Sequence, residues 1–205
     1  MKTNIIHRAL VWTCRIGNCR GFGIQSPWAY SLVCDVVNEH RPYYAYEELS
    51  VAFPALDVIK RRICRMLMRM ANYVQPKAVI SAAFDDADNL VAEAYIHSGC
   101  KRCDYVKVAS VESMMDILER RDIESEPYIV YFSAESADIE ISDAVRLMHK
   151  GDYLIVEDIY IDAQKRRKWK QTAKELQGVQ IFDLYYCAII YVDADRYKQN
   201  YIINF

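Results

Sequence analysis

Two kinds of hydrophobic pattern alternate along the second half of the chain. Continuously apolar runs, such as Tyr128–Phe132 and Tyr153–Val156, are typical of strands that are covered on both faces. Segments with apolar residues at three- and four-residue spacing separate these runs and indicate helices with one buried face. We expect strands near 78–82, 105–109, 128–133, 153–159, 179–186, 188–193 and 201–205, and helices near 88–98, 111–121, 138–149 and 163–176.

The stretch from Lys77 to Gly99 indicates the fold class. A short apolar run is followed by an acidic turn, a helical pattern and the closing glycine. A strand, a tight connection, a helix and a glycine stop form the opening unit of a doubly wound α/β domain. Because no helical pattern separates the strands at 179–186 and 188–193, we predict a mostly parallel sheet with an antiparallel terminal hairpin.

Residues 1–75 form a predicted helical region that precedes the α/β domain at 76–205. Ser26 followed by Pro27 is a typical helix start, because serine caps the first turn and proline fits the first helical position. The apolar spacing predicts helices at 4–16, 27–37 and 54–73.

Composition sets limits on the class of protein. The 205 residues are 53% hydrophobic and 26% charged, which excludes a largely disordered chain. The net charge of −2 provides no overall field toward nucleic acid or an anionic membrane. No apolar run approaches the roughly 18 residues of a membrane span, and His7 and Arg8 interrupt the apolar stretch at the N-terminus. We therefore expect a soluble cytoplasmic protein without a membrane partner.

The seven cysteines do not define a site by their spacing. Cys100 and Cys103 form the only CxxC pair, but they follow a helical pattern instead of opening one. We expect them to be loop cysteines, while a redox or metal role stays open. The four histidines are scattered along the chain without metal-ligand spacing, so no metal site is predicted.

Three stretches resemble one known family. They are Arg20–Tyr30 with its glycines and Ser-Pro-aromatic sequence, Gly151–Tyr160 with a strand that ends in two acids, and the closing segments Phe182–Tyr186 and Lys198–Phe205. Together they resemble the class I S-adenosylmethionine-dependent methyltransferases, and most closely a bacterial methyltransferase-like group with an N-terminal helical lead. The resemblance implies a Rossmann-like methyltransferase fold preceded by a helical region.

The resemblance also places the cofactor contacts at fixed motif positions. These positions are Ser81, Ala82, Ala83, Asp85, Ser110 and Ser133. The family uses a glycine-rich loop near 81–86, an acid after the second strand and an aspartate near 133, and this chain has none of them there. Phe84 would fill space that the ligand needs. We therefore expect no cofactor, or S-adenosylmethionine if the protein is active.

Glu157 and Asp158 are the acids at the end of a predicted strand. In the metal-dependent O-methyltransferases, a similar acidic position helps to bind a divalent cation. Adjacent strand residues point to opposite faces, so only one of the two could hold a cation or act as a base. If the protein is active, Glu157 or Asp158 is the candidate catalytic residue, and Trp28, Tyr43 and Tyr44 are the candidate lining of the acceptor pocket.

Three functions stay open at this point. The first is a degenerate relative that no longer transfers methyl groups and serves as a binding or scaffolding protein. The second is an active small-molecule O-methyltransferase. The third is a nucleic-acid-binding module that uses the basic stripe Arg61, Arg65 and Arg69 and the basic run 165–170, although such runs are more often solvated helix faces. We do not expect nucleic acid to be the partner, and a homodimer is an open alternative.

Overall fold

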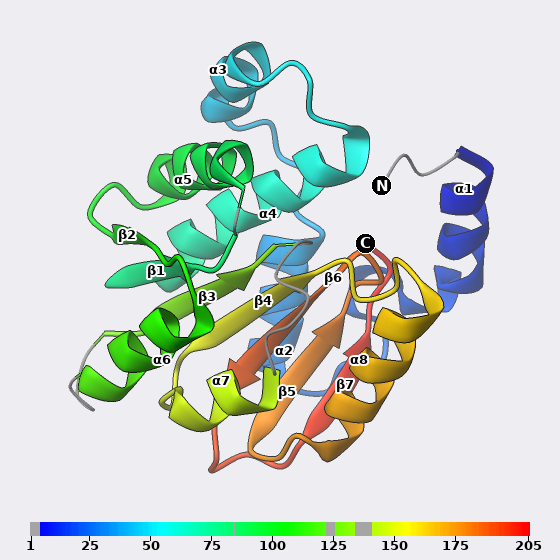
Figure 1. Cartoon of the computed structure of the whole chain (residues 1–205). Coiled ribbons are helices and arrows are strands. Elements are labelled where there is room, and N and C mark those ends of the chain that lie inside the picture. The colour runs from blue at the N-terminus through cyan, green and yellow to red at the C-terminus, as the bar shows by residue number, and fades with distance from the viewer. Residues whose placement is uncertain (1–4, 84, 122–125, 134–140) are drawn as a thin grey trace.

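The computed structural model describes residues 5–83, 85–121, 126–133 and 141–205. Its centre is a seven-stranded sheet in the order β2-β1-β3-β4-β6-β5-β7 (Figure 1). The strands are β1 (Ala78–Ser81), β2 (Asp104–Lys107), β3 (Tyr128–Phe132), β4 (Tyr153–Glu157), β5 (Val179–Asp183), β6 (Cys187–Val192) and β7 (Gln199–Ile202). Each lies within two residues of its predicted start, and this confirms the strand pattern.

Strand β6 is the one antiparallel member of the described sheet. It pairs with β4 and with β5 in the antiparallel sense, whereas β1, β2, β3 and β4 pair in parallel. The predicted antiparallel hairpin is therefore β5–β6. The chain then adds β7 at the edge, parallel to β5, so the hairpin is not the last unit of the sheet.

Helices cover both faces of the sheet. The N-terminal helices are α1 (Ile5–Cys14), the 3-10 helix η1 (Ile16–Gly21), α2 (Pro27–Leu32), the π-helix η2 (Val33–Val37), α3 (Tyr44–Ala52) and α4 (Val58–Val74). The later helices are α5 (Asp86–Gly99), α6 (Val111–Arg120), α7 (Ile141–Leu147) and α8 (Ala163–Glu175). α2, η2, α4 and α5 bury one face of the sheet, and α6, α7 and α8 bury the other.

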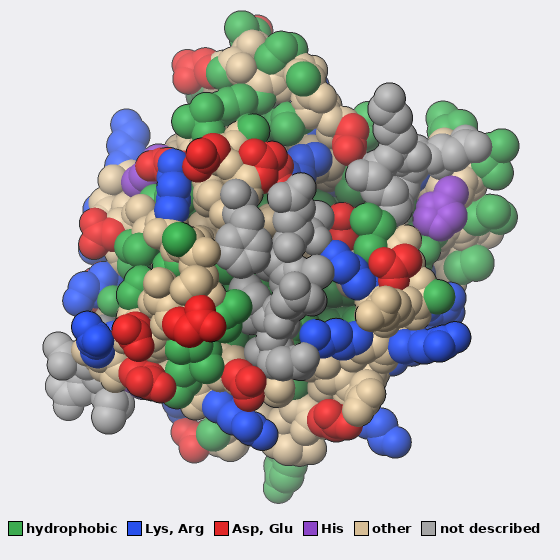
Figure 2. Space-filling model, viewed as in Figure 1, with side chains coloured by type: hydrophobic (Ala, Val, Ile, Leu, Met, Phe, Trp, Pro, Cys, Tyr) green, Lys and Arg blue, Asp and Glu red, His purple; other side chains and the backbone are tan. Residues whose placement is uncertain are grey.

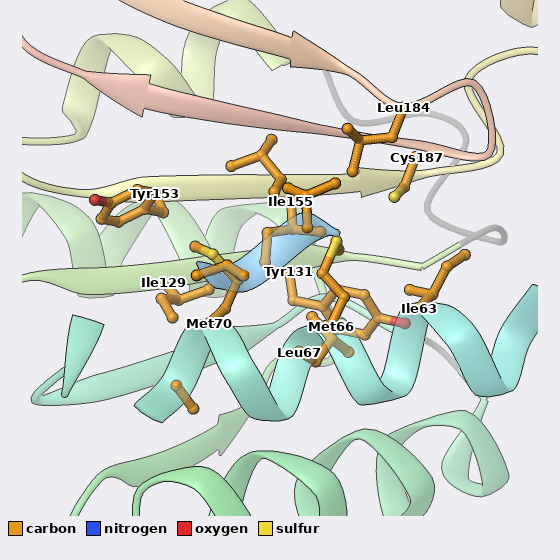
Figure 3. Close-up of a cluster of buried hydrophobic side chains, with 14 of the residues drawn as sticks. Ile63, Met66, Leu67, Met70, Ile129, Tyr131, Tyr153, Ile155, Leu184 and Cys187 are labelled. Atoms are coloured by element: carbon orange, nitrogen blue, oxygen red, sulfur yellow. The ribbon is translucent and has the colours of Figure 1, made fainter. Parts of the chain in front are cut away.

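The face under α4 shows how the predicted N-terminal region relates to the sheet. Ile63, Met66, Leu67 and Met70 extend from α4 into one cluster with Ile129, Tyr131, Tyr153 and Ile155 of the sheet (Figure 3). These α4 residues follow the three- and four-residue spacing that the sequence shows. The helix that closes residues 1–75 is therefore a layer of the α/β core, while the division into two domains stays a prediction.

Helix starts follow the capping chemistry of the sequence. Ser26 caps α2 and Pro27 is its first residue, as predicted. Asp57, Asp85 and Asp162 cap α4, α5 and α8 by accepting backbone N–H groups of the first turn. The predicted helix near 138–149 is described only as α7, because residues 134–140 lie outside the described part of the chain.

Two N-terminal elements differ from the sequence-based expectation. The single helix predicted for 27–37 changes to π geometry at Val33, where Asn38 N–H donates to the carbonyl of Val33 at 2.8 Å. The segment at 44–52 forms α3, where no helix was predicted. Only Tyr46 and Leu49 of α3 are buried, so the sequence carries no apolar stripe that would reveal a helix.

Gly99 allows a close contact between α5 and α4. A Cβ atom at Gly99 would lie 2.0 Å from the carbonyl oxygen of Met68, so only glycine fits where α5 ends against α4. By contrast, α1 buries none of its residues, and Figure 2 shows its hydrophobic side chains exposed at the upper right. Within the described ranges, no helix has the length and apolar character needed to cross a lipid bilayer.

Candidate functional site

A buried polar cluster lies at the carboxyl ends of β3 and β4. The ammonium of Lys60, in the first turn of α4, donates to Glu157 Oε2 at 2.9 Å, Asp88 Oδ2 at 3.2 Å and Tyr131 Oη at 3.2 Å. The Tyr131 hydroxyl donates to Glu157 Oε1 at 2.5 Å. One lysine thus joins α4 to α5, β3 and β4.

Burial dominates the electrostatics of this cluster. The Lys60 and Glu157 side chains are 15% and 3% exposed. Burial alone would lower the pKa of Lys60, but the carboxylates of Glu157 and Asp88 outweigh it and raise this pKa above its ordinary value. Burial raises the pKa of the Glu157 carboxyl, and Lys60 and Tyr131 offset only part of that shift. Because Lys60 lies between two carboxylates, we assign the pair its charged form at neutral pH.

The cluster occupies the place where this kind of sheet binds ligands. The strand order reverses between β1 and β3, because the chain adds β2 on one side of β1 and β3 with β4 on the other. Open α/β sheets bind ligands outside the carboxyl ends of their strands at such a point. Tyr131 lies on β3, and Asp88 lies in the first turn of the helix after β1. Lys60 was not among the predicted site residues, although its ammonium lies at this place.

The first strand-to-helix turn is held by Asn89. Ser81 Oγ donates to Asn89 Oδ1 at 2.7 Å, and Asn89 Nδ2 donates to the carbonyl of Ala83 at 2.6 Å. Tyr105 Oη donates to Asn89 Oδ1 at 3.1 Å. Ser81, Ala82 and Ala83 are all buried. Asn89 therefore joins Ser81, Ala83 and Tyr105 in one hydrogen-bonded group. Phe84, which was expected to fill this region, lies outside the described residues.

Two of the predicted motif residues cap helices. Asp85 is exposed and accepts from Ala87 N–H at 2.9 Å at the start of α5. Ser110 accepts from Ser113 N–H at 3.2 Å at the start of α6. Both side chains are engaged with their own helix, so the structure gives each a local role independent of any ligand.

Ser133, Glu157 and Asp158 line a small cavity of about 60 Å³ beyond β3 and β4. The Ser133 hydroxyl is buried and has no hydrogen-bond partner among the described residues. Asp158 follows the end of β4 in a left-handed conformation, with φ of +54°, and burial raises the pKa of its carboxyl. Ligand pockets usually measure about 300–1,000 Å³, so this cavity suits water or a small group only.

The predicted acceptor residues are divided between two places. Tyr43 and Tyr44 line a groove of about 950 Å³ between α3 and α4, which we call the α3–α4 groove; its lining comes from 37–50 and 56–69. Trp28 instead packs against Tyr191 of β6, with ring centroids 4.3 Å apart, and the guanidinium of Arg196 lies over its ring. The structure brings Tyr43 and Tyr44 together but places Trp28 elsewhere.

The basic run at 165–170 lies on α8. Figure 2 shows Lys and Arg side chains gathered over α8. Trp169 is buried and donates from Nε1 to Asp183 Oδ2 at 3.1 Å, so its ring is not available for stacking.

Cys100 and Cys103 are buried free thiols. Among the described residues, no three His, Cys, Asp or Glu side chains form a metal-binding group.

Several solved structures resemble this chain at low sequence identity. A structural-genomics protein from Corynebacterium glutamicum matches with a TM-score of 0.50 at 13% identity, over 81% of this chain and 96% of that chain. The O-methyltransferase TomG from Streptomyces achromogenes, in complex with SAM, matches with 0.44 at 11% identity, over 75% and 91% of the two chains. An O-methyltransferase from Bacillus cereus in complex with SAH matches with a TM-score of 0.44 at 12% identity, over 80% of this chain and 96% of that chain.

No protein-family model matches the sequence, and no curated protein matches it. The strand order, with one reversed strand between β4 and β5, and the match at a TM-score of 0.50 confirm the fold class predicted from the sequence.

Proposed function

We propose that this chain, which has the Rossmann-like fold of the class I methyltransferases, is a binding or scaffolding protein that does not transfer methyl groups. The observation that supports this most directly is the position of Lys60. Its ammonium lies among Asp88, Tyr131 and Glu157 at the point where the strand order reverses. In this fold, that point is where a ligand is bound.

The charge of the cofactor makes the position of Lys60 relevant. S-adenosylmethionine carries a positive sulfonium and a positive amino group against one carboxylate, so its net charge is positive, and a metal-dependent enzyme adds a divalent cation. Acids near the carboxyl ends of the strands would attract such cations, but Lys60 already neutralises Glu157 and contacts Asp88. A ligand cation would have to displace a buried ammonium and leave it without a carboxylate, which is costly. The residues present therefore do not fit the cofactor.

The turn after β1 supports the same proposal. Glycines in this turn let the backbone approach a nucleotide-like ligand. Here Ala82 and Ala83 stand in the turn, and Asn89 uses its amide to hold the carbonyl of Ala83. We infer that this turn is a structural connection.

Thermal denaturation with S-adenosylhomocysteine tests the proposal. Ligand at about 100 times its Kd would stabilise the protein by about 2.7 kcal/mol. We expect no rise in Tm at about 1 mM ligand, a concentration that would reveal a Kd of about 10 μM. A rise of several degrees, repeated with S-adenosylmethionine, would contradict the proposal.

An active S-adenosylmethionine-dependent O-methyltransferase is the second candidate. It is favoured by the unpartnered buried hydroxyl of Ser133 beside Glu157 and Asp158, because unsatisfied polar groups and carboxyls with raised pKa values gather at functional sites. Transfer of labelled methyl from S-adenosylmethionine to a panel of small hydroxyl-bearing acceptors in the presence of Mg²⁺ would support this candidate, provided that Asp158→Ala or Glu157→Ala abolishes it.

The proposal includes a cytoplasmic location, since buried free thiols such as Cys64 and Cys187 are typical of proteins kept reduced. Cell fractionation tests this location.

A nucleic-acid-binding function is not favoured. α4 and α8 cover opposite faces of the sheet, so their basic runs do not support one continuous binding surface.

A further inference from the structure

The α3–α4 groove is large enough for a small-molecule ligand. Its volume of about 950 Å³ falls within the range of about 300–1,000 Å³ that is usual for such sites. It lies on the outer side of α4, while Lys60 and the polar cluster lie on the side that faces the sheet. The groove is therefore a second place where this chain could bind a ligand, whether or not the crevice at the strand ends binds one.

The charge of the groove is strongly positive. Arg61, Arg62, Arg65 and Arg69 line it from α4, and Arg41 joins them from the preceding loop, against only two glutamates. None of the four α4 arginines forms an ion pair with a carboxylate in the part of the chain that the structure describes. Like charges four residues apart on a helix repel each other, as Arg61, Arg65 and Arg69 do here. The free protein therefore carries unbalanced positive charge along one helix face.

Not all of these arginines have the same role. Arg69 is buried and donates to the carbonyl of Val36 at 2.6 Å and to Tyr46 Oη at 2.8 Å, so it joins α4 to η2 and α3. Arg61 donates to the carbonyls of Pro54 and Leu56. These two arginines hold the walls of the groove in place.

Arg62 and Arg65 retain their donors. Among the described residues, neither guanidinium donates a hydrogen bond, and the Nε of Arg65 is buried without a partner, as is the Nε of Arg61. The Arg65 guanidinium lies 4.6 Å from the ring centroid of Tyr46, and that of Arg62 lies 4.7 Å from the ring centroid of Phe205. Each guanidinium thus lies over an aromatic ring, and a planar guanidinium without a carboxylate partner suits bidentate recognition of phosphate.

Tyrosines supply the aromatic part of the groove. Tyr43 and Tyr46 pack together with ring centroids 5.2 Å apart, while Tyr44 is 98% exposed at the start of α3. Exposed aromatic rings with polar tips are suited to stacking on a planar ligand. Several arginines beside free aromatic surface fit a ligand that has both phosphate and a planar ring.

We propose that the α3–α4 groove binds a small phosphorylated molecule with an aromatic ring, of the nucleoside phosphate class. Arg62 and Arg65 hold the phosphates, and Tyr44 contacts the ring. A single groove of this volume accommodates a mononucleotide, and the opposite placement of the second basic run on α8 favours a small molecule over a polynucleotide.

Calorimetry and thermal denaturation with ADP test this proposal on the full chain. We expect ADP to bind and raise Tm, adenosine to have no effect, and inorganic phosphate to bind more weakly. S-adenosylmethionine has no phosphate and should not compete with ADP. ADP binding at the α3–α4 groove can therefore be distinguished from cofactor binding at the strand-end crevice. Removing one charge-assisted contact by Arg65→Gln or Arg62→Gln should weaken ADP binding by about tenfold or more.

Arg120→Gln is the matched control, because Arg120 is an exposed arginine of α6, outside the groove, that pairs with Asp116. Its ADP affinity should equal that of the wild type. If Arg65→Gln does not fold, Arg62→Gln provides the same test without the contact to Tyr46. Absence of binding by AMP, ADP and ATP would overturn the proposal, as would unchanged affinity in both variants. Binding of a single-stranded oligonucleotide without binding of mononucleotides would overturn it in favour of nucleic acid.

Discussion

Lys60 and Glu157 form an ion pair at 2.9 Å that connects the first turn of α4 to the last residue of β4. The two residues are 97 positions apart in the chain, and their contact joins α4 to the carboxyl end of β4. The same ammonium contacts Asp88 and Tyr131. This pair is the basis of the proposal that the strand-end crevice does not bind a cationic cofactor.

Replacing Lys60 with methionine should destabilise the fold. Met has a similar length, but it leaves the carboxylate of Glu157 buried without its cation, and such losses cost about 3–5 kcal/mol. Urea denaturation should show a lower midpoint with an unchanged slope. Lys107→Met is the control, since Lys107 pairs with Glu93 in a solvent-accessible ion pair, and its loss should cost at most about 1 kcal/mol. Equal stability of both variants would argue against a structural ion pair at Lys60.

Asp158→Asn should become more stabilising as the pH rises. Burial raises the folded-state pKa of Asp158 above its unfolded value, so its contribution to stability is present at low pH and is lost as the pH rises through the folded pKa. Asn removes the charge and tolerates the left-handed backbone at this position. Urea denaturation between about pH 4 and 8 should show the gain of the variant over wild type growing with pH. A gain that shrinks with pH would mean that a native contact lowers this pKa.

Gly99→Ala should destabilise the packing of α5 on α4. The new Cβ would lie 2.0 Å from the carbonyl of Met68, so the two helices must separate, at a cost of about 1–3 kcal/mol. Gly17→Ala is the matched control, because a Cβ at Gly17 meets nothing within 4 Å, and its effect should be within about 0.5 kcal/mol. Equal Tm values for both variants would show that α4 and α5 do not approach this closely.

The buried thiols should be unreactive in the native protein. Burial raises the pKa of Cys103 to about 12 and that of Cys187 well above its ordinary value, and only the thiolate is nucleophilic. Alkylation followed by mass spectrometry should label the exposed Cys14 quickly and label Cys103 and Cys187 only after unfolding. Rapid native labelling of Cys100 or Cys103 at neutral pH would instead indicate a redox-active pair.

Local patterns in the sequence predicted most of the fold. The apolar runs around Tyr128 and Tyr153 were sufficient to place β3 and β4, because a strand covered on both faces needs apolar residues throughout. The predicted cap Ser26 marks a helix start that the structure confirms, whereas Ser110, predicted at a cofactor position, caps α6. α3 was missed since it buries only two side chains and its first cap, Tyr43, makes no side-chain hydrogen bond.

The contacts of the candidate site could not be predicted in the same way. Glu157 was identified because it ends an apolar run, but its partner Lys60 stood in the sequence only as one more cation beside an arginine stripe. Asn89 likewise appeared as an ordinary helix residue, although it holds the turn at Ala83. Contacts between distant elements depend on how the helices pack on the sheet, and no local spacing encodes them.

Calorimetric titration of S-adenosylmethionine and S-adenosylhomocysteine into the wild-type protein, with and without Mg²⁺, tests the central proposal most directly. We expect no binding heat from either ligand, because Lys60 already neutralises the acids at the strand ends. Binding in the micromolar range, about −8 kcal/mol, would contradict this proposal and support the O-methyltransferase.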